Sequence, residues 1–319
     1  MKQVVFGNTG IKVSEMCLGT MMFGDRCDIK ESEKILSTAM DNGVNLIDTA
    51  ESYMKGKTEE ILGSITQGKR DKLFIVTKGH ISETMSLEEK VNASLERLKT
   101  DYIDFYLIHW PKEKMDVYKV MESLDKIVKS GKVRFIGCSN YPLWLLAYSN
   151  EISLINNFKQ FSVLQIPYNI IERGVEVDVL PYTKVKNMAV ISYRPLVMGL
   201  LTGKYNPDKP IPENSRGATD ERIPMLLNKY SDGIRKFLEL AYEKEVTPAQ
   251  LAISWVRFSD FITAPIVGVS SVNQLETSLK AFETDITQDE YEKINSFFST
   301  DVKEESLGKY KSLRRNIIL

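Results

Sequence analysis

Short apolar runs alternate with amphipathic stretches along almost the whole chain. Eight of these runs have the length and near-continuous apolar character of buried strands, and they occupy residues 16–20, 45–48, 73–78, 104–109, 133–137, 161–165, 189–193 and 263–267. The stretches between them have helical spacing and cover residues 31–42, 58–65, 117–129, 175–186, 232–244 and 272–282, with further helices beginning near Ser86 and Pro142. Buried strands that alternate with helices are typical of a parallel sheet covered on both faces. Eight such repeats predict an α/β protein with a closed (β/α)8 TIM barrel.

The residues before the first repeat have the pattern of a β-hairpin. Two short strands, 4–6 and 11–13, flank Gly7-Asn8-Thr9-Gly10, whose composition favours a tight turn. We expect this hairpin to close the bottom of the barrel. No linker or shift of composition divides the chain, which predicts a single domain over residues 1–319.

Two segments do not follow the repeat. Residues 202–229 contain four prolines and several charges in a connection that follows the seventh strand. Because a connection of this length is usually functional or mobile, we expect it to have a role at the catalytic face. Residues 301–319 are basic near their end, and we expect them to form a solvated C-terminal tail.

Composition excludes several classes of function. The chain has 43% hydrophobic and 27% charged residues and a net charge of −1, which argues against nucleic acid or a membrane surface as the main partner. Three cysteines without a CxxC pair fit a reducing compartment, and no run has the length of a signal peptide or a membrane span, so we expect a cytoplasmic protein. With two histidines and no HExxH motif, we expect no metal site.

Three neighbouring predicted strands change from apolar to ionisable residues at their last inward position. The second strand ends at Asp48, the third at Lys78 and the fourth at His109, and Tyr53 follows Asp48 by five residues. Earlier positions on the same strand faces are apolar: Leu46, Phe74, Val76, Phe105 and Leu107. A single histidine on an apolar strand is more often a hydrogen-bonded core residue. The whole set would be costly as mere packing, however, and active sites of this fold gather at the C-terminal ends of the strands.

This set of residues predicts acid/base catalysis by Tyr53. We expect the Lys78 ammonium to lower the pKa of the phenol, Asp48 to hold that ammonium, and His109 to orient a substrate oxygen or assist the proton transfer. No serine or cysteine is paired with a base in a way that suits covalent hydrolysis. A general acid without a nucleophile suits carbonyl reduction, provided that a hydride donor binds beside it.

The motifs that carry these residues, NLIDTAESY, IVTKG and DFYLIHWP, resemble the four-residue signature of the aldo-keto reductase superfamily. The likeness covers nearly the whole chain and includes the branch related to bacterial aldo-keto reductases and potassium-channel β-subunits. It implies a (β/α)8 barrel that uses NAD(P)H without a Rossmann domain. In the family a tyrosine donates the proton, a lysine and an aspartate tune that tyrosine, and a histidine orients the carbonyl. The resemblance assigns these roles to Tyr53, Lys78, Asp48 and His109.

A nicotinamide cofactor would bind here without the common dinucleotide motif, because the chain has no GxGxxG. Residues 199–204 superficially suggest a P-loop, but they are one residue short and lack the final serine or threonine. The family resemblance instead implies contacts at strand ends and in the loops that follow: Gly19 and Thr20 beside the cofactor; Ser139, Asn140 and Gln165 at the nicotinamide amide; Tyr193 on its ring; Arg194, Pro195, Leu196 and Gly199 at the pyrophosphate; Lys204 and Arg216 at the 2′-phosphate; Gly268, Ser270 and Gln274 at the adenosine.

The basic residues at the 2′-phosphate favour NADP(H) over NAD(H). Two departures from the family pattern leave NAD(H) use open. Many members carry an arginine where Gln274 stands, and a Glu-Asn pair where Thr277 and Ser278 stand. From its position alone, Gln165 also suits the role of satisfying backbone groups of the barrel.

We expect Trp110, Met22 and Tyr141 to line the substrate pocket and His80 to lie on the surface or in a loop. The leading hypothesis is an NADPH-dependent reductase of aldehydes and ketones, whose partner is a small-molecule carbonyl compound. The alternatives are an NADP(H)-binding regulatory subunit with slow turnover and a barrel lyase or isomerase without net redox chemistry. His109 favours the reductase, because the channel-related branch often replaces it. The residues do not identify the substrate, the direction of the reaction or the oligomeric state.

Overall fold

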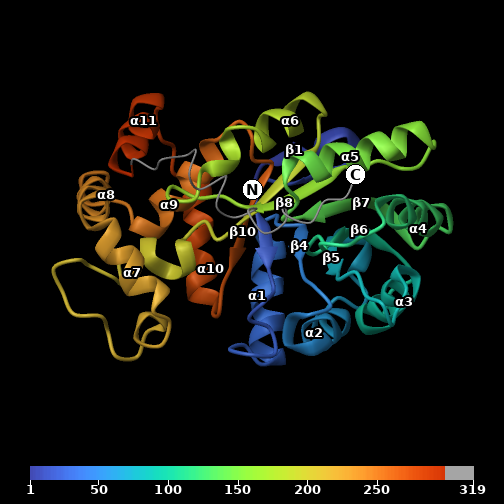
Figure 1. Ribbon diagram of the computed structural model, residues 1–319. Helices are drawn as coiled ribbons and strands as arrows, with labels where there is room; N and C mark the ends of the chain where they lie inside the picture. The colour runs from blue at the N-terminus through green and yellow to red at the C-terminus, as the bar shows by residue number, and fades with distance from the viewer. Residues whose placement is uncertain (299–319) are drawn as a thin grey trace.

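Eight parallel strands form a closed barrel that is surrounded by helices (Figure 1). The computed structural model describes residues 1–298, so the predicted tail at 301–319 lies outside the described residues. The barrel strands are β3 (Cys17–Gly19), β4 (Leu46–Asp48), β5 (Phe74–Gly79), β6 (Ile103–Ile108), β7 (Val133–Ser139), β8 (Val163–Pro167), β9 (Ala189–Tyr193) and β10 (Ala264–Gly268). They pair in sequence order, and β10 closes the ring against β3, which confirms the predicted TIM barrel.

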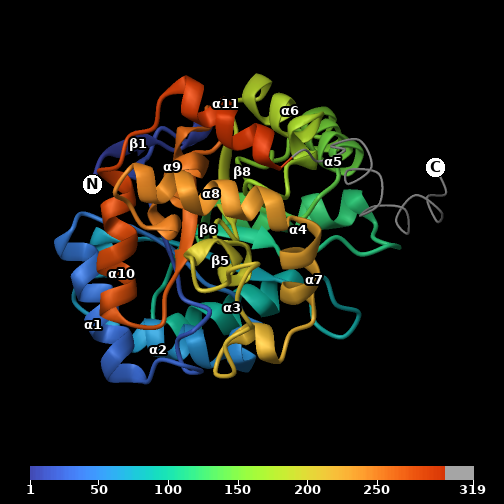
Figure 2. The same ribbon diagram turned by 90° about the vertical axis from the view of Figure 1, so that its left-hand side faces the viewer.

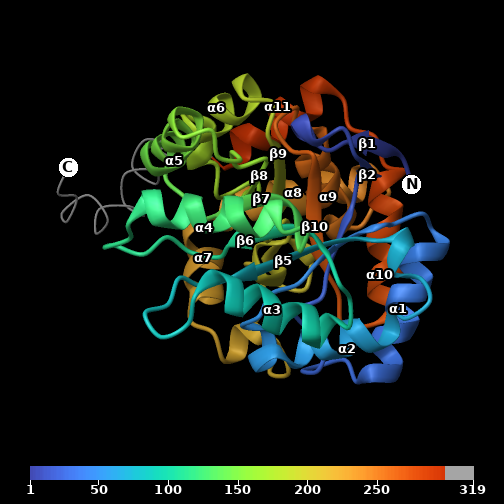
Figure 3. The same cartoon turned by 90° about the vertical axis from the view of Figure 1, so that its right-hand side faces the viewer.

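Helices cover the outside of the barrel on all sides (Figures 2 and 3). They are α1 (Ile29–Asp41), α2 (Lys57–Ile65), α3 (Leu87–Leu98), α4 (Val117–Lys129), α5 (Leu143–Ile155), α6 (Val179–Val185), α7 (Arg222–Lys229), α8 (Ser231–Glu243), α9 (Pro248–Phe258), α10 (Val272–Leu279) and α11 (Gln288–Phe297). Polar side chains begin several of them: Asp28, Ser86 and Asp116 each accept a hydrogen bond from the third backbone N–H of the helix that follows. Among residues 1–298, no helix is both long enough and apolar enough to cross a membrane.

The N-terminal hairpin closes the bottom of the barrel, as predicted. Strands β1 (Gln3–Val5) and β2 (Lys12–Ser14) pair antiparallel around a short 3-10 turn, η1 (Gly7–Thr9). Phe6 is fully buried, and its ring lies 4.6 Å from that of Phe105 inside the barrel. Gly7 has a positive φ of 56°, and a Cβ there would lie 2.3 Å from the Ala189 backbone nitrogen, so the close approach requires glycine.

Alternation along the strands produces two separate cores. One core fills the barrel and contains Cys17, Leu46, Val76, Phe105, Leu107, Val163 and Ile191. The other lies between the barrel and the helices and contains the neighbours that point outward, such as Ile47, Ile75, Tyr106 and Ile108. The inward row therefore carries the apolar residues expected behind Asp48, Lys78 and His109.

Some helices differ from the prediction. The helix expected at 175–186 begins only at Val179, because Pro181 is tolerated in a first helical turn and not in a helix interior. Helices α9 and α11 were not predicted, although each begins with a capping box, at Thr247 and at Thr287. The irregular segment 202–229 contains a 3-10 turn, η6 (Arg216–Ala218), and helix α7, and it extends away from the barrel beside α8 (Figure 1).

Candidate active site

The C-terminal mouth of the barrel brings together the four residues predicted for acid/base chemistry. Asp48 is the last residue of β4, and Lys78 is the fifth residue of β5. His109 directly follows β6, and its backbone N–H donates to the Gly79 carbonyl oxygen at 2.9 Å. Tyr53 begins a short 3-10 segment, η2 (Tyr53–Gly56), that follows β4.

A buried ion pair forms the base of the site. The Lys78 Nζ atom lies 2.6 Å from Asp48 Oδ1 and 2.6 Å from the Thr49 carbonyl oxygen, and Gln165 Nε2 donates to the same Oδ1 at 2.7 Å. The side chains of Lys78 and Asp48 are 0% and 4% exposed. Burial acts to lower the pKa of Lys78, but the charges of Asp48 and Tyr53 outweigh it and raise that pKa. Lys78 is therefore an ammonium at neutral pH.

The Tyr53 ring lies next to Lys78 of this pair. Lys78 Nζ is 5.2 Å from the centre of the Tyr53 ring, and the His109 ring meets the Tyr53 ring edge-on at 6.1 Å. The pKa of Tyr53 is raised, because burial disfavours the phenolate more than Lys78 favours it. The expected lowering by Lys78 is thus present as one contribution, but the predicted direction of the net shift was wrong. Tyr53 is a neutral phenol that retains its proton at neutral pH.

His109 is a neutral imidazole. Burial, together with the charges of Lys78 and His80, lowers its pKa from 6.5 to about 3. Its Nδ1 lies 3.4 Å from Ser52 Oγ, and its carbonyl oxygen accepts a hydrogen bond from Asn140 Nδ2 at 3.1 Å.

Sequence reasoning missed His80 as a member of this site. It lies in the loop directly after β5, as expected, and its half-buried ring stacks on that of His109 at 4.7 Å and 30°. The sequence contains one indication, because His80 follows Lys78 by two and directly follows the end of its strand, where the chain enters the mouth.

The residues predicted for the nicotinamide end form one hydrogen-bonded group next to Asp48. Ser139 and Gln165 pair across β7 and β8, and the Asn140 backbone N–H donates to the Gln165 carbonyl oxygen at 3.0 Å. Asn140 Nδ2 donates to Ser139 Oγ at 2.9 Å, and the Tyr193 hydroxyl donates to Asn140 Oδ1 at 2.6 Å. Thr20, which follows the neighbouring strand β3, donates from its Oγ1 to the Asp48 carbonyl oxygen at 2.9 Å.

The loop after β9 holds an uncommon backbone conformation. Arg194, Val197 and Met198 have positive φ angles of 62°, 48° and 57°, and Gly199 follows in the 3-10 segment η5 (Val197–Thr202). A left-handed β-branched residue costs about 1–3 kcal/mol, and such strain is concentrated at ligand sites. Pro195 and Leu196 lie inside this turn, where Leu196 accepts the Gly199 backbone N–H at 2.9 Å.

The strand ends beside this loop carry two glycines and several hydroxyl and amide groups. Gly268 and Gly19 pair at the ends of β10 and β3, and a Cβ added to Gly268 would meet only the Gly19 carbonyl oxygen, at 3.9 Å. Ser270 precedes α10, and both its N–H and its hydroxyl donate to Gln274 Oε1. The exposed Gly268, the hydroxyl and amide groups and the N-terminus of α10 are the kinds of groups that fit a nicotinamide dinucleotide.

The two basic residues predicted at the 2′-phosphate lie in the segment after η5. Lys204 is exposed, with its Nζ 5.9 Å from the centre of the Tyr205 ring. Arg216 pairs with Asp220 at 3.1 Å and lines a groove of about 650 Å³ that Met22 lines from the opposite loop. An anionic ligand at Arg216 therefore competes with the carboxylate of Asp220.

Two of the three residues predicted for the substrate pocket lie at accessible positions. Trp110 is 47% exposed directly after His109, and Met22 is half-buried in the loop after β3. Tyr141 differs, because it is fully buried between barrel and helices, edge-on to Phe161. The structure therefore does not bring Tyr141 to an open surface.

Comparisons with known proteins agree with this geometry. The model of the Aldo/keto reductase family matches residues 15–298. "Uncharacterized oxidoreductase YrpG" of Bacillus subtilis (strain 168) is 32% identical over 93% of this chain and 96% of that protein, and "Aldo-keto reductase YhdN" of the same organism is 28% identical over 95% and 96%. A protein of Schizosaccharomyces pombe (strain 972 / ATCC 24843) named for a voltage-gated potassium channel subunit beta is 28% identical over 87% of each chain. The chain belongs to the aldo/keto reductase family.

Proposed function

We propose that the protein is an NADPH-dependent oxidoreductase that reduces aldehydes and ketones to alcohols, with Tyr53 as the general acid. The observation that carries this proposal is a neutral phenol held between a buried ammonium and a neutral imidazole at an open barrel mouth. A reductase needs a proton for the carbonyl oxygen and a group that stabilises the anion left on the proton donor.

Each side chain has a separate part in this reaction. A reduced nicotinamide, when bound, would supply the hydride for the carbonyl carbon. Tyr53 gives its phenolic proton to the carbonyl oxygen, and the Lys78 ammonium stabilises the phenolate that results. Asp48 holds Lys78 in the charged state and in place. His109, neutral at working pH, donates a hydrogen bond that orients the carbonyl oxygen.

The chain's own groups would hold the cofactor. Ser139, Asn140 and Gln165 provide amide and hydroxyl groups beside Asp48 for the nicotinamide carboxamide, and the ring of Tyr193 lies next to them. The left-handed turn from Arg194 to Gly199 presents backbone groups suited to the pyrophosphate. Arg216 and Lys204 would favour NADPH over NADH by contact with the 2′-phosphate.

The first experiment is a fluorescence titration with NADPH and NADH, followed by a screen of aldehydes and ketones with the nucleotide that binds. We expect wild type to oxidise NADPH and Tyr53→Phe to bind it equally well with a rate at least about 100-fold lower. Arg216→Ala should weaken NADPH binding and leave NADH binding unchanged. Arg235→Ala removes another exposed, paired arginine from α8 and is the matched control.

One alternative has a specific observation in its favour, the relative named for a channel β-subunit. A regulatory subunit of that kind would bind NADPH with negligible turnover of every carbonyl tested. In that outcome the reductase proposal fails. A protein that binds neither nucleotide would contradict both and favour a lyase or isomerase.

A further inference from the structure

His80 has no part in the reaction described above, yet it makes the closest ring contact of His109. The two imidazoles stack at 4.7 Å and 30°, whereas the Tyr53 ring meets His109 edge-on at 6.1 Å. Among residues 1–298, the His109 ring makes one side-chain hydrogen bond, to Ser52 Oγ, which is exposed and long at 3.4 Å. A single long hydrogen bond does not determine the plane of an imidazole ring. The stacked face of His80 is a further contact of the same ring, and it is closer than the ring of Tyr53.

The position of His80 is itself well determined. Its backbone N–H donates to Glu51 Oε1 at 2.8 Å, and the same oxygen accepts Lys90 Nζ at 3.0 Å. Glu51 in turn donates its backbone N–H to the Lys78 carbonyl oxygen at 3.1 Å. The side chains of Glu51 and Lys90 are 14% and 12% exposed, so this bridge lies mostly away from water. Glu51 therefore connects the loop that carries Tyr53 to the strand end that carries His80.

Gly79 permits this arrangement. A Cβ at Gly79 would lie 2.0 Å from the hydroxyl of the buried Tyr106 and 3.5 Å from the carboxyl carbon of Glu51. Strand β5 can therefore pass Tyr106 and deliver His80 to the mouth only because residue 79 has no side chain.

The charges around the two rings are compatible with a stack of neutral imidazoles. Burial and Lys90 act to lower the pKa of His80, Glu51 acts to raise it, and the pKa is lowered on balance. Burial lowers the pKa of His109 most, and the charges of Lys78 and His80 lower it further, while the neutral Tyr53 ring meets His109 edge-on. Two neutral rings stack without the repulsion that two imidazolium ions would have.

We propose that His80 is a positioning residue, whose ring holds the imidazole of His109 in the plane from which its Nε2 reaches the carbonyl oxygen. This inference rests on the proposed reductase function. His80 acts through His109, and a ring of similar shape should replace it. Loss of the ring should leave cofactor binding intact and reduce the chemical step, because orientation of the carbonyl would be lost.

The kinetic test compares His80→Ala and His80→Phe with wild type, and Thr84→Ala is the control in the same loop. We expect His80→Ala to lower kcat about tenfold with an unchanged Kd for NADPH, and His80→Phe to retain most of the activity. Because His80 acts through His109, adding His80→Ala to His109→Ala should change kcat by less than about twofold. Thermal melts report whether each variant is folded.

A second measurement needs no turnover. The chain has two histidines, so each His80 variant of the untagged protein leaves His109 as the only imidazole in an NMR spectrum. In His80→Phe the His109 signals should stay sharp and titrate far below pH 6.5, as in wild type. In His80→Ala they should broaden, and the titration should move toward pH 6.5.

Three results would overturn the positioning role. They are wild-type kcat in His80→Ala, equal losses in His80→Ala and His80→Phe, and unchanged His109 signals in His80→Ala. If the protein shows no turnover but the NMR changes occur as expected, the reductase proposal is contradicted. The stacking role of His80 would then still hold.

Discussion

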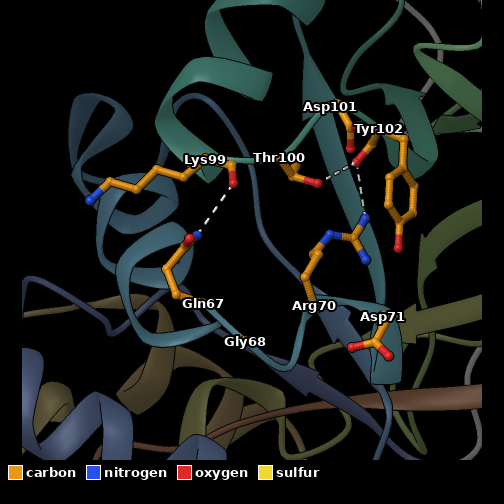
Figure 4. A pocket seen from close by; sticks show the side chains of 8 residues that line it. All are labelled: Gln67, Gly68, Arg70, Asp71, Lys99, Thr100, Asp101 and Tyr102. Atoms are coloured by element: carbon orange, nitrogen blue, oxygen red, sulfur yellow. Dashed lines mark hydrogen bonds between the residues drawn. The ribbon is translucent and has the colours of Figure 1, made fainter.

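Asp48 and Asp104 are both buried carboxylates in ion pairs, but they lie at opposite ends of the barrel. Asp104, near the N-terminal end of β6, accepts hydrogen bonds from Arg70 at 2.8 Å, from Arg134 at 2.9 Å and from the Ile75 backbone N–H at 3.0 Å. Arg70 also lines a groove of about 600 Å³ on this face. Figure 4 shows its guanidinium between the segment of Asp71 and that of Tyr102. Guanidinium groups remain charged at any working pH, so this cluster has no proton to exchange.

At the C-terminal end, the partner of Asp48 is a lysine, and a tyrosine and a histidine lie beside it. Lysine, tyrosine and histidine side chains can each gain or lose a proton, and their surroundings in a protein can shift the pKa values at which they do so. Burial of a charge is therefore common to both ends. What distinguishes the site is a set of exchangeable protons around the buried pair, at the end where the loops are open.

The two ends of the barrel also differ in where non-glycine residues adopt positive φ angles. Near the mouth, non-glycine residues with positive φ occur in consecutive pairs, Met54–Lys55 and Val197–Met198, and also at Asn140 and Arg194. At the opposite end they are single residues at the C-terminal ends of α3, α5, α6 and α8: Lys99, Asn157, Asn187 and Glu245. Single left-handed residues are ordinary helix ends, whereas consecutive ones store strain at a functional loop.

The largest effect is expected from Lys78→Met, which removes the ammonium group and leaves the carboxylate of Asp48 buried. Turnover should fall at least about 100-fold, because the Tyr53 phenolate loses its stabilising charge. The free energy of unfolding should fall by about 3–5 kcal/mol, since Asp48 stays buried with Gln165 as its remaining side-chain partner. Steady-state kinetics and urea denaturation measure the two effects. Lys57→Met, which breaks an exposed pair with Glu60, should change neither by much.

Much of this comparison was predictable from the chain. Period-two alternation and the rule for strand ends located Asp48, Lys78 and His109, because both depend only on local sequence and on barrel closure. The role of His80 depends on a contact between two loops, and the direction of the Tyr53 pKa depends on its total burial, and neither quantity can be read from spacing. Helices α9 and α11 differ from these cases, because their capping boxes are visible in the sequence and both helices could have been predicted from it.

Asp104→Ala should affect stability without affecting chemistry. It leaves Arg70 and Arg134 without their shared carboxylate, and we expect the free energy of unfolding to fall by about 3 kcal/mol. The kcat of the folded enzyme should equal that of wild type, because the pair lies at the far end of the barrel. Denaturation curves and kinetics well below the melting temperature check both statements. A large loss of kcat in the folded variant would mean that the two ends are coupled.

His109→Gln should change how stability depends on pH. The folded chain keeps His109 neutral down to about pH 3, whereas an unfolded chain protonates it near 6.5. The unfolded state therefore binds more protons between these values, and wild type loses stability as the pH falls through this window. The variant should lose less between pH 6.5 and pH 4.5, and the two proteins should have parallel curves above pH 7.5. Denaturant midpoints across this range measure the difference, and identical pH dependence would contradict a neutral His109.

The smallest effects are expected from relief of backbone strain at one residue from each end. Lys99 and Lys55 are both exposed lysines with left-handed φ, of 52° and 55°. A left-handed residue costs about 1–2 kcal/mol, and the greater freedom of unfolded glycine offsets part of that, so Lys99→Gly and Lys55→Gly should each stabilise the fold by about 0.5 kcal/mol. Only Lys55→Gly should lower kcat, by about twofold, because it loosens the segment that holds Tyr53. Equal kcat values in the two variants would show that the strain beside Tyr53 has no part in holding the phenol in place.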